Sequence, residues 1–368
     1  MKIKQSFYDT FCCIADQCPL TCCMQWKIAV DGETKDDWRT KTFEGKPLSS
    51  YLSKKDGADV ICLDGRKFCP FLDEKRLCSL VRLYGEDVLS ETCHTFPRQV
   101  HDFGTVQEYS LVSCCPAVID LLDKQDIGSF LEKEEQGKEE PLFAVRTLLM
   151  NFIANERHSV ATALLMGYFI LSDLYERCGD EEIQEQNLTR YFSRQFQEEL
   201  YTAVEEREDT FLESLNERGE LWLDIVENYR REGLYTEYIE EISRTVQPEK
   251  SDEQYRKFLG KLEAFMPLLR KFLLSELFTN LLIPDGDLLS MVVKMQWISM
   301  EYAAVCHGIY LKWRSQGAAL LDYKMVKEYM VIVSRMMGYD EEDIYEYMEN
   351  SFECIVWEWG YMAFMLGK

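Results

Sequence analysis

The stretch FCCIADQCPLTCCMQW, residues 11–26, contains five cysteines, two of them adjacent at Cys22 and Cys23. So dense a group of thiols has three common explanations: a disulfide framework, a structural zinc site or an iron–sulfur cluster. The chain has 368 residues, which is enough for two domains with a large core. A chain of this size has no need of disulfides for stability, so the first explanation is the weakest.

The overall composition is that of a globular protein, with 46% hydrophobic and 29% charged residues. The beginning of the chain lacks the apolar segment of a signal peptide, and the longest apolar run, residues 160–171, is too short for a transmembrane helix. We therefore expect a cytoplasmic protein without a membrane partner, in which thiols stay reduced. The net charge of −24 argues against nucleic acid as a partner, because its phosphates would be repelled.

Cysteine and charge are distributed unevenly along the chain. Eleven of the 14 cysteines lie within the first 115 residues. Residues 1–125 carry a net charge of −3 and residues 126–368 one of −21, and the charged stretch LEKEEQGKEEP (131–141) lies just beyond this change. The sequence thus predicts a cysteine-rich metal-binding module over residues 1–130 and a helical domain over residues 141–368.

The first part of the chain has the patterns of short strands and hairpins. WKIAVD (26–31) alternates apolar and polar residues, and the Asp-Gly pair within residues 58–72 predicts a hairpin. A turn within CPFLDEKRLC (69–78) would place Cys69 opposite Cys78. A strand is also expected over residues 108–113, and a helix with a proline in its first turn over residues 115–124.

The second part has the apolar period of helices almost throughout. Helices are expected over residues 142–178 with breaks, from residue 251 to about 279, and over 288–316, 322–337 and 341–366. The fold class is therefore α+β and mostly α: a small cysteine-rich N-terminal module with short strands and hairpins, packed on a large helical body.

Thiolates are the metal-binding form of cysteine, and a cluster of them repels itself unless a cation lies among them. Zinc sites usually contain two C-x2-C pairs, whereas the spacing here is C-x4-C-x3-C-C and no C-x2-C occurs. Iron–sulfur clusters accept looser spacing, because the cluster is larger than a single ion. An iron–sulfur cluster is therefore favoured, with zinc and inert thiols as the alternatives.

Several of these motifs resemble those of the flagellin lysine-N-methylase family, which belongs to a wider group with a cysteine-rich iron- or zinc-chelating domain. The resemblance covers roughly residues 7–122. The matching positions are Cys13, Cys18, Cys22, Cys23 and Trp26; Cys69, Pro70, Phe71, Leu72 and Cys78; Cys93, Thr95, Phe96, Pro97 and Arg98; and Glu108, Ser110, Leu111, Cys115 and Pro116. The chain departs from the family pattern at His94, Gln25 and Cys114, where arginine, glycine and serine are usual, and Cys12, Cys62 and Cys114 are additional cysteines.

The resemblance implies a protein-lysine N-methyltransferase that uses S-adenosylmethionine and carries a 4Fe–4S cluster, with zinc as the alternative metal. The implied metal ligands are Cys13, Cys18, Cys22, Cys23, Cys69, Cys78, Cys93 and Cys115. The implied substrate is a flagellin-like protein with exposed lysines, which the acidic body would attract. Neither a glycine-rich dinucleotide loop nor a C-x3-C-x2-C motif is present, so the enzyme would have neither common S-adenosylmethionine architecture.

The guanidinium of Arg98 suits the carboxylate of an amino-acid-like cofactor, so Arg98 is the candidate cofactor-binding residue. No general base is identified among the tyrosines and carboxylates. A second hypothesis is a non-catalytic metal-binding protein, a redox or iron sensor, whose helical body binds other proteins.

Overall fold

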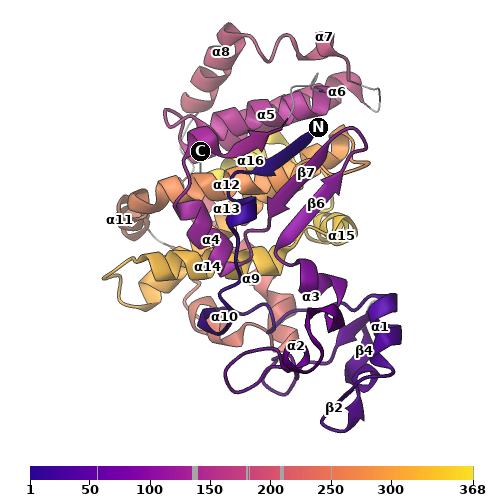
Figure 1. Ribbon diagram of the computed structural model, residues 1–368. Coiled ribbons are helices and arrows are strands. Elements are labelled where there is room, and N and C mark those ends of the chain that lie inside the picture. The colour runs from indigo at the N-terminus through magenta and orange to yellow at the C-terminus, as the bar shows by residue number, and fades with distance from the viewer. Residues whose placement is uncertain are drawn as a thin grey trace.

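The computed structural model describes residues 1–55, 57–134, 140–179, 181, 183–207, 211–249 and 251–367. Helices dominate and the strands are short, which confirms the α+β, mostly helical class. Figure 1 shows a large lobe and, below it, a small lobe. We define the small lobe as residues 27–95 and the cysteine loop as residues 11–26, with the remaining residues in the large lobe. No helix within the described ranges has both the length and the apolar character that a membrane span requires.

A four-stranded sheet in the large lobe has the order β6-β7-β1-β8. Its strands are β1 (Lys2–Gln5), β6 (Arg98–Asp102), β7 (Gln107–Leu111) and β8 (Leu131–Lys133). β1 runs parallel to β7 and the other neighbours are antiparallel. The Gln5 side chain accepts a hydrogen bond from the Leu111 N–H (2.7 Å) and donates one to the Ser275 hydroxyl (2.9 Å), which ties the sheet to the helices.

The helices of the large lobe enclose one extended hydrophobic core. They are α4 (Pro116–Asp123), α5 (Pro141–Ala154), α6 (Val160–Cys178), α7 (Glu185–Leu188), α8 (Arg194–Glu205), α9 (Phe211–Glu232), α10 (Thr236–Ser243), α11 (Glu253–Leu262), α12 (Met266–Asn280), α13 (Leu288–Ser315), α14 (Tyr323–Met337), α15 (Glu341–Phe352) and α16 (Trp359–Leu366), with short 3-10 turns at Tyr8–Thr10, Ala15–Gln17, Ile127–Ser129 and Glu263–Phe265. α13 is buried along most of its length and packs against α6, α9 and α14.

Several of these helices begin or end at the residues that the sequence indicates, whereas α7, α8, α9 and α10 had no predicted bounds. Side chains of Ser159, Asp287 and Asp322 accept hydrogen bonds from the first turns of α6, α13 and α14, and Gly179 and Gly338 follow the ends of α6 and α14. The strand at residues 108–113 and the helix at 115–124 are also confirmed, as β7 and α4.

Two expected long helices are interrupted. The helix predicted from residue 251 to 279 is split into α11 and α12, because Pro267 lacks the N–H that would continue the hydrogen-bond ladder. The helix predicted over 341–366 is split into α15 and α16, because Glu353, the residue after α15, has a left-handed backbone with φ of 56°.

The small lobe has a hydrophobic core of its own, formed by Ile28, Val30, Trp38, Leu48, Ile61, Cys69, Phe71, Leu80 and Val88. Its elements are α1 (Gly32–Trp38), β2 (Thr42–Phe43), β3 (Lys46–Pro47), a 3-10 turn (Leu48–Tyr51), β4 (Leu52–Lys55), β5 (Ala58–Ile61), α2 (Ser79–Tyr84), a 3-10 turn (Glu86–Val88) and α3 (Glu91–Thr95). The indole of Trp38 donates to the Val88 carbonyl (2.8 Å), which joins the first and last parts of this lobe.

The expected hairpins of the small lobe form at different places. Residues 26–31 contain only an isolated bridge between Ala29 and Val60, because the chain leaves the extended conformation at Asp31 to cap α1. Within residues 58–72 the predicted turn forms at Asp64–Gly65, where the Lys67 N–H donates to the Asp64 carbonyl (2.9 Å) and the Asp64 N–H to the Phe68 carbonyl (2.7 Å). The residues on either side do not pair as strands of a hairpin, because β5 pairs with β4 instead.

The turn within residues 69–78 forms as predicted, but with a different register. The Asp73 N–H donates to the Leu77 carbonyl (2.9 Å), and Cys78 lies opposite Leu72 instead of Cys69. The turn therefore spans residues 73–77, somewhat later in the chain than expected, and Cys69 lies three residues before the position opposite Cys78.

The four-stranded sheet and α4 belong to the same hydrophobic core as the helices that follow, through residues such as Ile3, Leu111 and Val118. The predicted domain boundary between residues 130 and 141 stays a prediction. Residues 135–139 of the charged stretch lie outside the described residues.

Candidate metal centre

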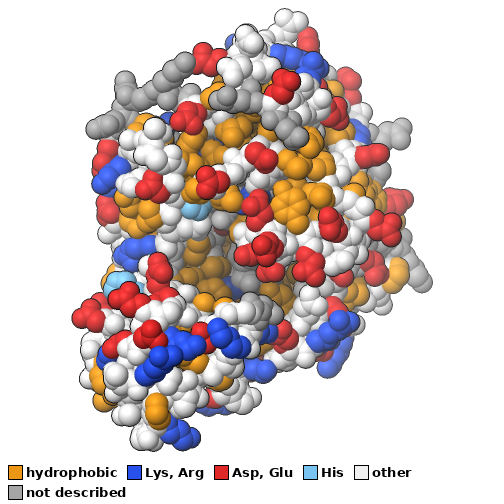
Figure 2. Space-filling model, turned by 90° about the vertical axis from the view of Figure 1, so that its right-hand side faces the viewer, with side chains coloured by type: hydrophobic (Ala, Val, Ile, Leu, Met, Phe, Trp, Pro, Cys, Tyr) orange, Lys and Arg blue, Asp and Glu red, His pale blue; other side chains and the backbone are white. Residues whose placement is uncertain are grey.

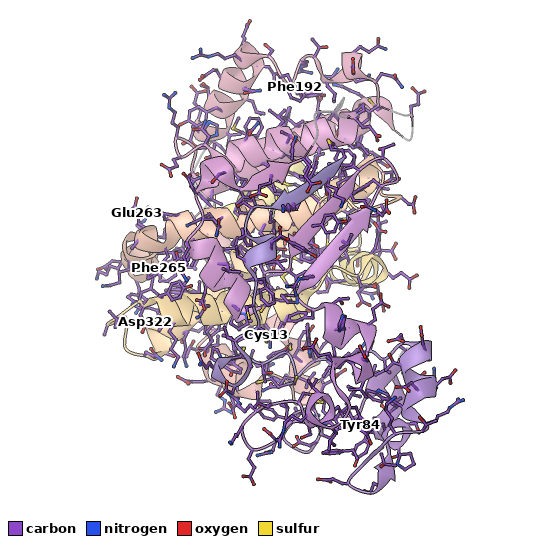
Figure 3. The ribbon with its side chains drawn as sticks, in the orientation of Figure 1. Cys13, Tyr84, Phe192, Glu263, Phe265 and Asp322 are labelled. Carbon is purple, nitrogen blue, oxygen red and sulfur yellow. The ribbon has the colours of Figure 1, made fainter. Side chains whose placement is uncertain are left out.

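The cysteine loop is held between the two lobes, and Cys13 lies in Figure 3 where the lobes meet. On the side of the small lobe, the Cys69 N–H donates to the Cys23 carbonyl (2.8 Å) and the Gln25 N–H to the Lys67 carbonyl (2.8 Å). These backbone bonds fix the second half of the loop against the segment that contains Cys69.

Eight thiols from four separate segments are linked in pairs, because each affects the pKa of at least one other or is affected by it. They are Cys13, Cys18, Cys22 and Cys23 of the loop, Cys69 and Cys78 of the small lobe, Cys93 of α3, and Cys115 before α4. Cys114 is linked to the set in the same way through Cys115. We call this set the cysteine network. It contains the eight residues that the sequence predicts as ligands, and all fourteen cysteines of the chain are free thiols.

Cys22 is the residue shared by two groups within the network. On one side it interacts with Cys115, which also interacts with Cys18. On the other side it interacts with Cys69 and Cys93, and these two both interact with Cys78. The network is therefore continuous through Cys22.

Burial keeps most of these thiols protonated. It raises the pKa of Cys69 and of Cys115 to about 12, and that of Cys93 to about 11, and in each case neighbouring thiols of the network raise it further. A hydrogen bond from Cys23 lowers the pKa of Cys22, and burial opposes that shift. A cation among these sulfurs would stabilise the thiolates and reverse the effect of burial.

Within the described residues, no three or more side chains of His, Cys, Asp or Glu surround a point in the manner of a single-ion site. The assignment of individual ligands among the eight cysteines therefore stays a prediction.

Arg335 of α14 is a central residue that the sequence analysis missed. Its guanidinium donates to the carbonyls of Leu20 (2.7 Å), Thr21 (3.2 Å) and Cys114 (3.0 Å), and it lies 5.4 Å from the centre of the Trp26 ring. It thereby joins the cysteine loop to the segment that leads to Cys115. The sequence signal for this residue was a single arginine within the mostly apolar run VIVSRMM, because arginine is rarely buried without a partner.

The positive charge of Arg335 also acts on the network itself. It favours the thiolate forms of Cys18, Cys22 and Cys114, although burial is the dominant influence on Cys18 and Cys114 and raises the pKa of both.

The departure at Gln25 has a structural explanation. Its φ is 63°, a left-handed conformation that glycine adopts without strain, so the backbone here favours the glycine that is usual in the family. Its side-chain oxygen accepts a hydrogen bond from the N–H of Tyr235, which provides a second contact between the loop and the large lobe.

The remaining departures lie around the network. Cys12 and Cys62 are exposed, and so is His94. Cys114 interacts with Cys115, and burial raises its pKa to about 12.

Arg98, the predicted cofactor-binding residue, contacts the start of the cysteine loop. Its guanidinium donates to the Phe11 carbonyl (3.2 Å) and lies 5.0 Å from the Phe11 ring centre and 5.9 Å from that of Tyr8. The side chain thus fastens the first residues of the loop, while Arg98 as a whole remains exposed. Its role toward a cofactor stays a prediction.

Comparison with known proteins gives relatives of one kind. The Lysine-N-methylase of Salmonella typhimurium strain LT2 is 26% identical over 202 residues, which is 50% of this chain and 50% of that protein. The Lysine-N-methylase of Salmonella choleraesuis is 26% identical over 213 residues, again 50% of each. The Flagellar biosynthetic protein FliU of Salmonella muenchen is 29% identical over 152 residues, 36% of this chain and 82% of that protein.

No family model matches the chain, and no solved structure matches it. The chain spans about half the length of the lysine-N-methylases that it matches. The printed names agree with the resemblance carried by the cysteine motifs. The chain is therefore related to the flagellin lysine-N-methylase family.

Proposed function

We propose that this protein is an S-adenosylmethionine-dependent protein-lysine N-methyltransferase that carries a 4Fe–4S cluster. The observation that carries the proposal is the cysteine network: the eight cysteines of the family motifs, from four segments, interact as one set between the lobes. Ligand sites favour such junctions. The names of the relatives support lysine methylation as the activity.

The donor set fits an iron–sulfur cluster in its chemistry. Its members are thiols from separate loops: Cys69 and Cys115 are buried, Cys13 is exposed and the others are partly buried. Arg335 offsets part of the negative charge that their ionisation creates. Cys13, Cys18, Cys22, Cys23, Cys69, Cys78, Cys93 and Cys115 are the residues from which the ligands would come. A bound cluster would supply a redox-active metal centre.

Methyl transfer itself requires a free amine. The lysine nitrogen must lose a proton before it bonds to the methyl carbon, while the carbon–sulfur bond of the sulfonium breaks. The protein therefore has to hold the amine, keep water away and accept its proton. Figure 2 shows a hollow between the lobes, with carboxylates of the large lobe above it and both carboxylates and lysines or arginines of the small lobe below it.

The test of the proposal begins with anaerobic purification. The protein should be brown and contain iron and acid-labile sulfide in equal amounts, bind S-adenosylmethionine, and methylate lysines of a purified flagellin. One equivalent of zinc without sulfide would contradict the cluster. An intact cluster without S-adenosylmethionine binding would contradict the methyltransferase and favour a redox or iron-sensing protein.

A conservative change at Arg98 tests its role. We expect Arg98→Lys to retain iron but to weaken S-adenosylmethionine binding by about 1–3 kcal/mol, because a point charge replaces a bidentate donor. Isothermal titration calorimetry and iron analysis on the same sample measure both quantities. Unchanged binding in an iron-replete variant would remove Arg98 from the cofactor site, and loss of iron would make it a fastener of the cysteine loop.

An acidic groove lies at the connection between the end of β6 and the start of β7, and it suits a lysine-bearing protein segment. Its volume is about 710 Å³, and among the described residues that line it there is no lysine or arginine. The carboxylates of the lining are Asp102, Glu140, Glu181, Asp285 and Asp287, and apolar side chains such as Phe103, Phe143 and Leu282 lie among them. This charge would attract and hold cationic segments.

Neutralising this groove should weaken substrate binding and leave chemistry unchanged. For the triple variant Glu140→Gln, Glu181→Gln and Asp285→Asn, we expect KM for flagellin to rise several-fold, most strongly at low salt, with kcat preserved. Steady-state methylation at two salt concentrations measures this. The control neutralises three exposed carboxylates near α8, Glu198, Glu199 and Glu206. An equal rise in both triples would mean that only net charge matters.

A further inference from the structure

Two carboxylates are buried side by side in the large lobe without a cationic partner. Glu276 of α12 is 3% exposed and Glu301 of α13 is 0% exposed. Among the described residues, neither forms an ion pair with a lysine or arginine. Burying a charge in this way is costly, so the arrangement requires an explanation beyond packing.

Polar groups surround the pair on every side. The Tyr339 hydroxyl donates to Oε2 of Glu301, and the Asn280 amide donates to Oε2 of Glu276 (2.7 Å). The Ser113 hydroxyl lies near Glu276 and the Ser334 hydroxyl near Glu301, and each lowers the pKa of that carboxyl, although neither forms a regular hydrogen bond. Oε1 of Glu301 likewise accepts no regular hydrogen bond.

The electrostatics of the pair favour a bound proton. Burial, and after it the charge of Glu276, raises the pKa of Glu301 to about 8, and burial also raises the pKa of Glu276. Two carboxylates this close share protons as one unit. The titratable groups that face them are Tyr339, which follows α14, and Cys114, which follows β7.

The pair lies directly behind the cysteine network. Both carboxylates raise the pKa of Cys114, which is adjacent to Cys115, and Ser334, adjacent to Arg335, faces Glu301. Cys114 and Tyr339 are partly exposed, whereas the carboxylates are not. Tyr339 therefore connects the interior pair with a partly exposed position just beyond α14, the helix whose Arg335 contacts the cysteine loop.

We propose that Tyr339 and the buried Glu276–Glu301 pair form the proton acceptor for the substrate lysine. This inference rests on the proposed methyltransferase function. The ammonium gives one proton to the Tyr339 oxygen while the proton of Tyr339 passes to Glu301. The lone pair left on the nitrogen forms the bond to the methyl carbon, and the electron pair of the broken carbon–sulfur bond stays with sulfur, which becomes a neutral thioether.

The proton-accepting form of the pair increases as pH rises, because Glu301 is protonated below its pKa. The wild-type methylation rate should therefore rise with pH through about 8. Glu301→Gln, which preserves volume, and Tyr339→Phe should each lower the rate by about 100-fold or more and remove this inflection. Iron content and S-adenosylmethionine binding should be unchanged. Glu263→Gln, in the exposed turn before α12, is the control that removes a carboxylate elsewhere.

Infrared spectroscopy provides a readout that does not depend on activity. The wild-type protein should show the carbonyl stretch of a buried protonated carboxyl group, and Glu301→Gln should lose it. A full rate and an unchanged pH profile in both iron-replete variants would overturn the inference. Absence of the infrared band from the wild-type protein would overturn the protonated pair, whatever the methylation rate. Absence of any methylation by the wild-type protein would instead contradict the proposed function.

Discussion

Cys22→Ser is expected to remove most of the iron from the anaerobically purified protein and to lower methylation by more than about 100-fold. Cys22 joins the two groups of the cysteine network, because it affects the pKa of Cys115 on one side and of Cys69 and Cys93 on the other. A serine hydroxyl does not ionise at neutral pH and is a poor ligand for iron. Replacing the Cys22 thiol should therefore lower iron content more than replacing a residue that only contacts a ligand.

Iron, zinc and acid-labile sulfide analysis, together with the visible absorption spectrum, would measure this effect. Cys62→Ser is the matched control, because Cys62 is exposed and lies outside the network. Full iron content in Cys22→Ser would show that the shared position is not a ligand. An equal loss in both variants would point to general sensitivity of the cysteines to replacement.

Arg335→Met is expected to lower the free energy of unfolding by about 3–5 kcal/mol and to reduce iron content with it. The change keeps an apolar stem of similar length but leaves the carbonyls of Leu20, Thr21 and Cys114 without their donor. It also removes the positive charge that favours the thiolates of Cys18 and Cys22. Urea denaturation of the apoprotein and iron analysis of the purified protein separate the two effects.

Arg314→Met provides the comparison for this prediction. Arg314 is another largely buried arginine, and its guanidinium donates to Glu249 and to the Thr245 carbonyl. These bonds involve no residue of the cysteine network. The change should also destabilise the fold while leaving iron content unchanged. If Arg335→Met retains full iron, the residue only supports the fold. If Arg335→Lys restores iron without restoring stability, charge is what the network requires.

Much of the candidate site follows from residues near one another in the chain. The density of thiols in residues 11–26 marks the cysteine loop, and the family resemblance adds Cys69, Cys78, Cys93 and Cys115 as implied ligands, an assignment that stays a prediction. Local signals also predict α6, α13 and α14. Each has an apolar period and a serine or aspartate cap, and a glycine follows α6 and α14. Local signals of this kind need no information about distant segments.

The parts that the sequence did not reveal are those that join distant segments. The Glu276–Glu301 pair is an example: each residue stands alone within an apolar helical stretch, and its neighbour is 25 residues away on another helix. A single charged residue in such a stretch was a signal, but it did not say which groups would meet it. The breaks at Pro267 and Glu353 were missed because the apolar period continues across them.

The sequence by itself therefore determined the class of the fold and many of its helices, because each depends on local conformational preference. Only the tertiary structure decided that β1 runs parallel to β7, that Arg335 holds a loop more than 300 residues earlier in the chain, and that two carboxylates lie behind Cys114. Such contacts form because the packing of a whole core brings these groups together, and local preference carries no information about which distant surfaces will meet.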